Sequence, residues 1–211
     1  TKKGKSGKLK INYDSYYGKK FIQREVEMSD AYRYVYYNNT ALGSTSYFNF
    51  TQPYNTKRLD EITDEGEVSS NYISMSGGSE NANFYFGVTN LKEKGILIGT
   101  QFERTNLNSR NEYNFFDKKL KINQSINVSI VKNSPKPLSA FTNAYKQSPI
   151  VPVRFGNGRW GVPLRDPSTG QVDINGSDRF NNVGNPVAQL FYTNEENRNV
   201  VLFGNIGAEL S

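Results

Sequence analysis

Alternating apolar and polar residues mark the middle of this chain. Residues 105–115 and 120–130 repeat with a period of two, which predicts β-strands and not helices. Each stretch is about as long as a strand needs to cross a bilayer, and the short gap between them, 116–119, predicts a hairpin. In the second stretch one face is almost wholly apolar, so this strand needs an apolar medium on one side. Its two faces are Leu120, Ile122, Gln124, Ile126, Val128 and Ile130 against Lys121, Asn123, Ser125, Asn127 and Ser129.

The same alternation predicts four more strands, at residues 9–17, 72–76, 83–91 and 200–210. Short connections alternate with longer ones along the chain. This rhythm is typical of outer-membrane barrels, which have short periplasmic turns on one rim and longer extracellular loops on the other, whereas a soluble sandwich has no reason to sort its loops in this way. The pattern therefore predicts an all-β chain that is part of a large antiparallel transmembrane β-barrel with long extracellular loops.

Two long segments, 19–70 and 132–198, carry no convincing strand pattern. Residues 25–37 are long enough for a short helix, but no clean apolar stripe supports one, so we predict a loop there. The second segment contains most of the prolines, together with clusters of Gly, Asn and Asp. Loops of this length are either functional or disordered.

Composition narrows the chemistry. The chain has 211 residues, of which 36% are hydrophobic, with 14 Tyr, 13 Phe, no Cys and no His. The mean hydropathy of -0.68 does not exclude a membrane protein, because a transmembrane strand shows lipid only every second residue. Without Cys and His there are no thiol nucleophiles, disulfides or histidine bases, and most zinc sites are excluded. The net charge of +6 comes without a nucleic-acid-reading motif, so we expect no nucleic-acid partner. We also expect no metal and no cofactor.

Several stretches resemble the SusC/RagA family of TonB-dependent outer-membrane transporters. Residues 1–8 (TKKGKSGK) and 11–18 (INYDSYYG) are similar to the junction at which the family's plug domain ends and its first barrel strand begins. The other stretches are similar to two early barrel hairpins and to loop phrases of the family. They are 73–80 (ISMSGGSE), 83–86 (NFYF), 93–96 (EKGI), 104–107 (RTNL), 120–122 (LKI), 144–153 (AYKQSPIVPV) and 185–190 (NPVAQL).

This resemblance implies a fragment of a much larger, roughly 22-stranded antiparallel barrel. Residues 1–7 would be the C-terminal end of the plug domain, and residues 8–211 the first six or so strands, with loops 19–70 and 132–198. Six strands cannot close a barrel, since the usual minimum is about eight, so we expect the remaining strands beyond residue 211. The signal peptide, the TonB-contacting segment and most of the plug are expected before residue 1.

The resemblance also implies a function. Members of the family import oligosaccharides, glycans or peptides across the outer membrane of Bacteroidota. A SusD-like surface lipoprotein closes over the barrel as a lid, and TonB supplies the energy. We therefore expect a nutrient transporter and not an enzyme. Its implied partners are the SusD-like lipoprotein, TonB (through a segment absent here), outer-membrane lipid, and an oligosaccharide or peptide cargo.

Five residues are candidate substrate contacts. Trp160, the sole tryptophan, follows Arg159 in the second long loop, where its ring could stack on a sugar or peptide group; alternatively, it pins the loop. Tyr145 belongs to a loop phrase of the family. Arg110 and Glu112 lie on the polar face of residues 105–115, which would line a polar lumen or, alternatively, the solvated face of a soluble sheet.

No catalytic, cofactor-binding or metal-binding residue is predicted. No pair of carboxylates stands out as a glycosidase site. Asp166, Asp173 and Asp178 do not satisfy the spacing of an EF-hand calcium loop, so we interpret them as turn residues.

Alternatives to a transporter remain open from the sequence. A soluble β-sandwich that binds carbohydrate, or a carboxylate-based glycosidase module, would also be rich in Tyr and Asn. A third alternative is a structural or adhesin-like barrel of the same membrane. Dependence on detergent separates the transporter from the soluble proteins, and energy-dependent uptake separates it from the adhesin.

Overall fold

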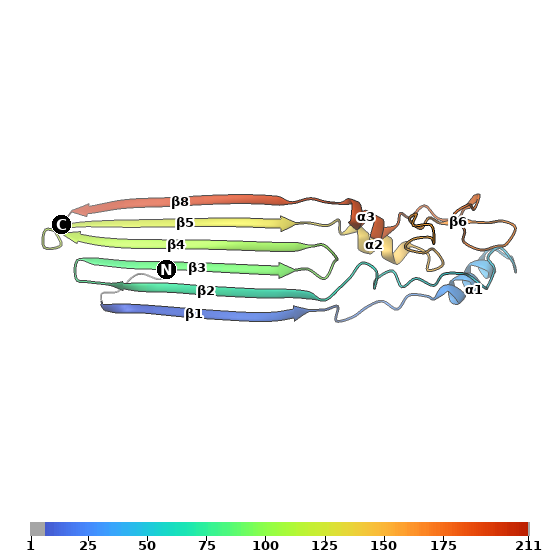
Figure 1. Ribbon diagram of the computed structural model, residues 1–211, viewed down its shortest axis with the longest axis horizontal. Helices are drawn as coiled ribbons and strands as arrows, with labels where there is room; N and C mark the ends of the chain where they lie inside the picture. The colour runs from blue at the N-terminus through green and yellow to red at the C-terminus, as the bar shows by residue number, and fades with distance from the viewer. Residues whose placement is uncertain (1–6, 211) are drawn as a thin grey trace.

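The computed structural model describes residues 7–210. It consists of a long antiparallel sheet and, beyond one end of its strands, a cap of helices and loops (Figure 1). Residues 1–6, which hold most of the predicted plug end 1–7, lie outside the described residues. Gly7, the last residue of that predicted segment, already belongs to the first strand.

Six strands form the sheet in the order β1-β2-β3-β4-β5-β8, and every neighbouring pair is antiparallel. The predicted strands and the predicted hairpin are confirmed, although the strands are longer than the alternation indicates. Their bounds are Gly7–Lys20 (β1), Gly66–Gly78 (β2), Ala82–Lys94 (β3), Gln101–Phe115 (β4), Leu120–Ser134 (β5) and Asn197–Leu210 (β8).

The register aligns residues of like polarity across the sheet. One row of mutually paired positions crosses all six strands with apolar or aromatic side chains: Tyr13, Ile73, Val88, Leu107, Val128 and Leu202. The neighbouring row, which points to the opposite face, is mostly polar: Asp14, Tyr72, Thr89, Asn106, Ser129 and Val201. We call these the apolar face and the polar face. The apolar face is uncovered, and Leu202 on it is 70% exposed.

The connections are sorted by length, as predicted. The short turns 79–81 and 116–119 lie at one end of the sheet, and the longer connections lie at the other (Figure 1). In the second short turn Phe116, Asp117 and Lys118 all have positive φ angles of 52°, 52° and 70°. This left-handed backbone matches the right-handed twist of the strands that it joins.

The cap corrects the prediction that 19–70 and 132–198 are loops. The first segment contains the helix α1 (Ala31–Ala41), the end of β1 and the start of β2. The second contains the end of β5, the start of β8 and four short elements. These elements are the helices α2 (Ser139–Lys146) and α3 (Pro186–Tyr192) and the paired strands β6 (Leu164–Arg165) and β7 (Asp178–Arg179).

Local sequence explains two of these helices. The Asp30 side chain accepts a hydrogen bond from the Arg33 amide and caps α1. The Asn185 side chain caps α3 in the same way, and Pro186 follows it at the first helical position, where its missing N–H costs nothing. Within residues 7–210, no helix is long and apolar enough to span a membrane.

Two small hydrophobic cores hold the cap together. The first joins the β1–β2 connection to the β3–β4 turn and to the helices α2 and α3 of the β5–β8 connection. It consists of Leu59, Ile62, Leu97, Ala140, Ala144 and Leu190. The second joins α1 and Phe48 of the β1–β2 connection to the β5–β8 connection. It consists of Val35, Phe48, Ile150, Phe155 and Val172. The two long connections therefore fold as one unit.

Candidate functional site

The polar face of the sheet carries charges of both signs. Arg110 and Glu112 of β4 line a cavity of about 340 Å³ on this face, near the short turns. Glu112 forms an ion pair with Lys121 of β5 at 3.2 Å. The remaining wall includes amide side chains, among them Asn123 and Asn205. Such a surface offers hydrogen-bond donors and acceptors to a polar solute.

Aromatic hydroxyl groups pack on the same face. The hydroxyl groups of Tyr72 and Tyr85 lie 2.6 Å apart and share a hydrogen bond. Tyr85 is buried, and its ring lies over Gly87, where an added Cβ atom would come within 2.9 Å of the Tyr85 hydroxyl. Gly87 therefore leaves the space that the ring occupies, and it marks a close approach within the strand. The polar face is thus partly ordered by its own side chains.

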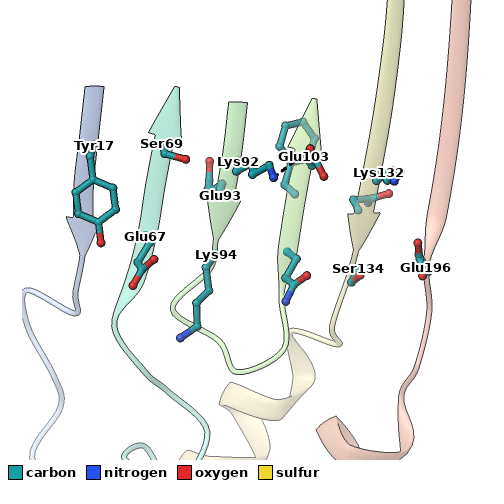
Figure 2. A pocket seen from close by; sticks show the side chains of 13 residues that line it. Tyr17, Glu67, Ser69, Lys92, Glu93, Lys94, Glu103, Lys132, Ser134 and Glu196 are labelled. Carbon is teal, nitrogen blue, oxygen red and sulfur yellow. Dashed lines mark ion pairs between the residues drawn. The ribbon is translucent and has the colours of Figure 1, made fainter. Parts of the chain in front are cut away.

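The apolar face ends in a polar belt near the cap. Figure 2 shows charged and hydroxyl side chains of neighbouring strands around a cavity of about 510 Å³ where the strands end. In register, Ser69, Lys92, Glu103 and Lys132 occupy one row across β2, β3, β4 and β5. Lys92 and Glu103 form an ion pair at 3.7 Å. The apolar face is therefore a band bounded by this belt.

Trp160 is held in place by its neighbours in the cap. Its indole Nε1 donates a hydrogen bond to the Tyr192 hydroxyl at 3.0 Å. The Arg154 guanidinium lies 3.5 Å from the ring centroid, and Phe191 packs against the ring with centroids 5.5 Å apart. One face of the indole is thus covered by Arg154, which supports the alternative that Trp160 pins its loop to α3.

The aromatic surface that this cluster presents comes from α3. Phe191 and Tyr192 are the exposed aromatic members of the cluster, and no alternation or motif in the sequence singled them out. Arg159 is exposed in the adjoining turn, where its carbonyl accepts a hydrogen bond from the Phe155 amide at 2.8 Å. The contact of Trp160 and Arg159 with substrate remains a prediction.

A third cavity, of about 670 Å³, lies within the cap. Residues 25–30 and 55–60 form two of its walls, and the end of α2, with Tyr145, forms another. Arg58 lines this cavity and is 5% exposed. Burial lowers the pKa of its guanidinium to about 10. Sequence reasoning missed Arg58, because nothing in its neighbourhood indicates that it is buried.

The aspartates that resemble a calcium loop have structural roles. The Asp178 carboxylate accepts hydrogen bonds from the Tyr47 hydroxyl at 2.8 Å and from Arg165 Nε at 3.0 Å, and these bonds hold its pKa below the ordinary value. Asp166 and Asp173 accept bonds from backbone amides two residues ahead, as turn residues do. In the part of the chain that the structure describes, no group of three acidic side chains could hold a metal ion.

The five predicted contacts therefore lie in three places. Arg110 and Glu112 are together on the polar face, Trp160 and Arg159 are together beside α3, and Tyr145 lines the cap cavity. The structure does not join these three places into one site.

Comparison with known proteins identifies similar chains, although no family model matches this one. The chain is 29% identical over 109 residues to the TonB-dependent receptor P3 of Formosa agariphila, a match that covers 49% of this chain and 10% of the relative. Its fold is similar to a chain in the structure of the RagAB peptide importer in the closed-closed state. That likeness has a TM-score of 0.58 and 15% identity, and it covers 76% of this chain and 22% of the other.

The first likeness confirms the predicted resemblance to TonB-dependent receptors, and the second shows that the fold is similar to that of a RagAB chain. The chain spans about a tenth of the curated relative and about a fifth of the structural neighbour. The relative is named as a receptor, and the structural neighbour belongs to an importer.

Proposed function

We propose that this chain is part of the wall and outer cap of a TonB-dependent outer-membrane transporter. The apolar face would contact lipid, the polar face would line the lumen, and the cap would lie outside the cell. The observation that carries the proposal is the register, which aligns an apolar band across six strands while all short turns lie at one end.

The length of the band fits a bilayer. On β5 it runs from Leu120 to Ile130, a path of about 34 Å at the usual rise per residue of an antiparallel strand. A strand tilted by about 45° would then cover a height of roughly 24 Å, close to the apolar band of known barrels. The strand residues beyond Ile130 would carry the chain out of the membrane to the cap.

The edges of the sheet indicate a larger assembly. Within residues 7–210, β1 and β8 each pair with a strand on one side only. Backbone groups left unpaired in lipid are very costly, so membrane-spanning sheets are closed barrels. We propose that further strands of the same protein pair with both edges.

The cargo would be a polar solute. Hydrogen-bonding groups and paired charges on the polar face suit an oligosaccharide, a glycan or a peptide, and the fold neighbour is described as a peptide importer. A SusD-like lipoprotein would close over the cap, where the α1 residues Tyr32, Tyr36 and Tyr37 are exposed. TonB would supply energy through another part of the protein. Trp160, Arg159, Tyr145, Arg110 and Glu112 remain the proposed cargo contacts.

A soluble carbohydrate-binding sandwich is not favoured. In a sandwich, a second sheet covers the apolar face of the first, whereas in the described residues the six-stranded sheet is a single layer with that face uncovered.

The test is fractionation of the source cells, followed by uptake. The full-length protein, detected with an antibody against residues 132–198, should require detergent for extraction and should sediment with the outer membrane. Cells that lack it should lose uptake of an oligosaccharide or peptide, and collapse of the proton gradient should abolish that uptake in the wild type. A soluble protein of about 24 kDa would overturn the proposal.

A further inference from the structure

The two faces of the sheet exchange polarity near the cap (Figure 1). There the apolar face carries the charged and hydroxyl side chains of the polar belt. The opposite face, which is polar along most of its length, carries apolar side chains at this end. They are Val68 on β2, Leu91 on β3, Phe102 on β4, Val131 on β5, and Val201 and Phe203 on β8. We call these six residues the inner apolar patch.

The register makes this patch continuous. From strand to strand, each member lies two residues away from the position paired with the previous member, and therefore on the same face. This diagonal step leads from Val68 to Leu91, then to Phe102, Val131 and Val201. Side chains in diagonal positions lie about 7–8 Å apart, within reach of large residues. An apolar path therefore crosses the face from β2 to β8.

The inner apolar patch lies outside both cores of the cap. Val201 and Phe203 are each 61% exposed, and the other four side chains are half-buried. The chain before residue 7 joins the sheet at the opposite end, because Gly7 and Gly18, the partner of Val68, lie at the two ends of β1, about 35 Å apart along the strand. An exposed apolar patch on a polar surface marks an interaction site.

Charges of both signs accompany the patch on its face. Glu93 and Arg104 lie beside it in the register, and Glu93 forms an ion pair with Lys20. Toward the short turns, Glu112 is paired with Lys121 on the same face. The face therefore combines apolar groups, hydrogen-bonding groups and both kinds of charge.

We propose that the inner apolar patch binds apolar side chains of a peptide cargo at the mouth of the lumen. A peptide presents apolar side chains, a hydrogen-bonding backbone and terminal charges of both signs, and this face offers partners for all three. An oligosaccharide is less suited, because its hydroxyl groups would lose hydrogen bonds to water over side chains that cannot replace them. The inference rests on the proposed function, which places this face in a lumen, and selects a peptide from the proposed classes of cargo.

The first experiment is calorimetric titration of the purified full-length protein in detergent. The probes are the pentapeptides Gly-Leu-Gly-Phe-Gly and Gly-Ser-Gly-Asn-Gly, which have the same length and charge, and the neutral sugar cellopentaose. We expect the first peptide to bind at least about tenfold more tightly than the other two probes, since only its apolar side chains leave water on binding. Binding of this peptide that is no tighter than that of the others, or no binding of any probe, would overturn the inference.

Substitutions test the patch itself. Phe203→Asn and, at the far side of the patch, Leu91→Asn should each weaken binding of the apolar pentapeptide about tenfold. Phe116→Asn makes a matched change at a side chain that is 75% exposed in the turn at the opposite end of the sheet, and it should bind like the wild type. If another segment of the protein covers the patch, the first two variants should melt at a lower temperature and still prefer the apolar peptide as the wild type does. That result, or equal effects of all three variants, would show the inference to be wrong.

The inference and the proposed function fail separately, because binding in detergent does not require transport. If the apolar pentapeptide binds as expected but cells show no energy-dependent uptake, the proposed transport fails and the peptide site stands. If cells take up cellopentaose with energy dependence and the protein does not bind the pentapeptide, transport stands and the inference is overturned.

Discussion

Two adjacent positions in β5 should respond in opposite ways to arginine. Ile126 lies on the apolar face, paired in register with Ser109 and Gly204. Asn127 lies on the polar face, paired with Asn108 and Phe203. Under the proposed function, Ile126→Arg places a charge in lipid, and Asn127→Arg places the same charge in the lumen.

The depth of the position sets the size of the effect. Along the strand, Ile126 lies about 20 Å from Leu120 and about 14 Å from Ile130, which places it near the middle of the band. Its in-register neighbours are small, so little packing is lost and the cost is mainly that of a charge in hydrocarbon. Arginine at the midplane of a barrel costs about 2–4 kcal/mol. Asn127→Arg should stay within about 0.5 kcal/mol, as surface changes do.

The assay is denaturant unfolding of the full-length protein refolded into lipid vesicles. The expected result is a lower unfolding free energy for Ile126→Arg and an unchanged one for Asn127→Arg. In detergent-free extracts, the first variant should also reach the membrane fraction at a lower level. Equal costs at both positions, or a larger cost at position 127, would refute the assignment of the two faces.

Three further predictions concern the cap. Gly161→Ala should destabilise the cap by about 1–3 kcal/mol, because the added Cβ would lie 1.7 Å from the Pro152 carbonyl oxygen. The control Gly156→Ala meets no atom within 4 Å and should be neutral. Limited proteolysis should cleave the cap faster in the first variant only. Asp178→Asn should weaken the cap by leaving the buried Arg165 guanidinium without its counter-charge. Because the pKa of Asp178 is lowered, its stabilisation of the cap holds above the ordinary carboxyl pKa of about 4 and is lost as pH falls below it. Acidification should therefore lower the unfolding free energy of the wild type more than that of this variant. Ile62→Ala removes a fully buried side chain and should cost the cap about 2–5 kcal/mol, seen as faster amide exchange there and unchanged exchange in the sheet.

The sequence predicted the sheet because strands with one apolar face follow a local rule, the alternation of apolar and polar residues. Alternation is visible wherever one face is apolar, as in residues 120–130. It disappears where both faces are polar, which is why the start of β2 at Gly66 and the end of β5 at Ser134 were missed. In those parts the strands are held by backbone pairing to neighbours, which no side-chain pattern records.

The helix α1 was missed for a different reason. Its buried positions are Val35 and Asn39, and the second of these is polar. Asn39 is buried because its side-chain amide bonds the carbonyl and the amide of Phe48. The exposed positions are rich in tyrosine, so the contrast between the two faces is weak. A helix whose inner face is partly polar and whose outer face is aromatic gives no clear stripe.

The features of the cap that carry its chemistry depend on contacts distant in sequence. Arg58 reaches the carbonyl of Val151, and Tyr47 bonds Asp178 across the two long connections. Neither partner could be predicted from composition or spacing, because burial arises only when both connections fold together. The same construction links the stability of one connection to that of the other. Asp178→Asn weakens a bond between the two connections and should therefore speed amide exchange in residues 21–65 as well as in residues 135–196. Faster exchange confined to one of them would contradict a cap that folds as a single unit.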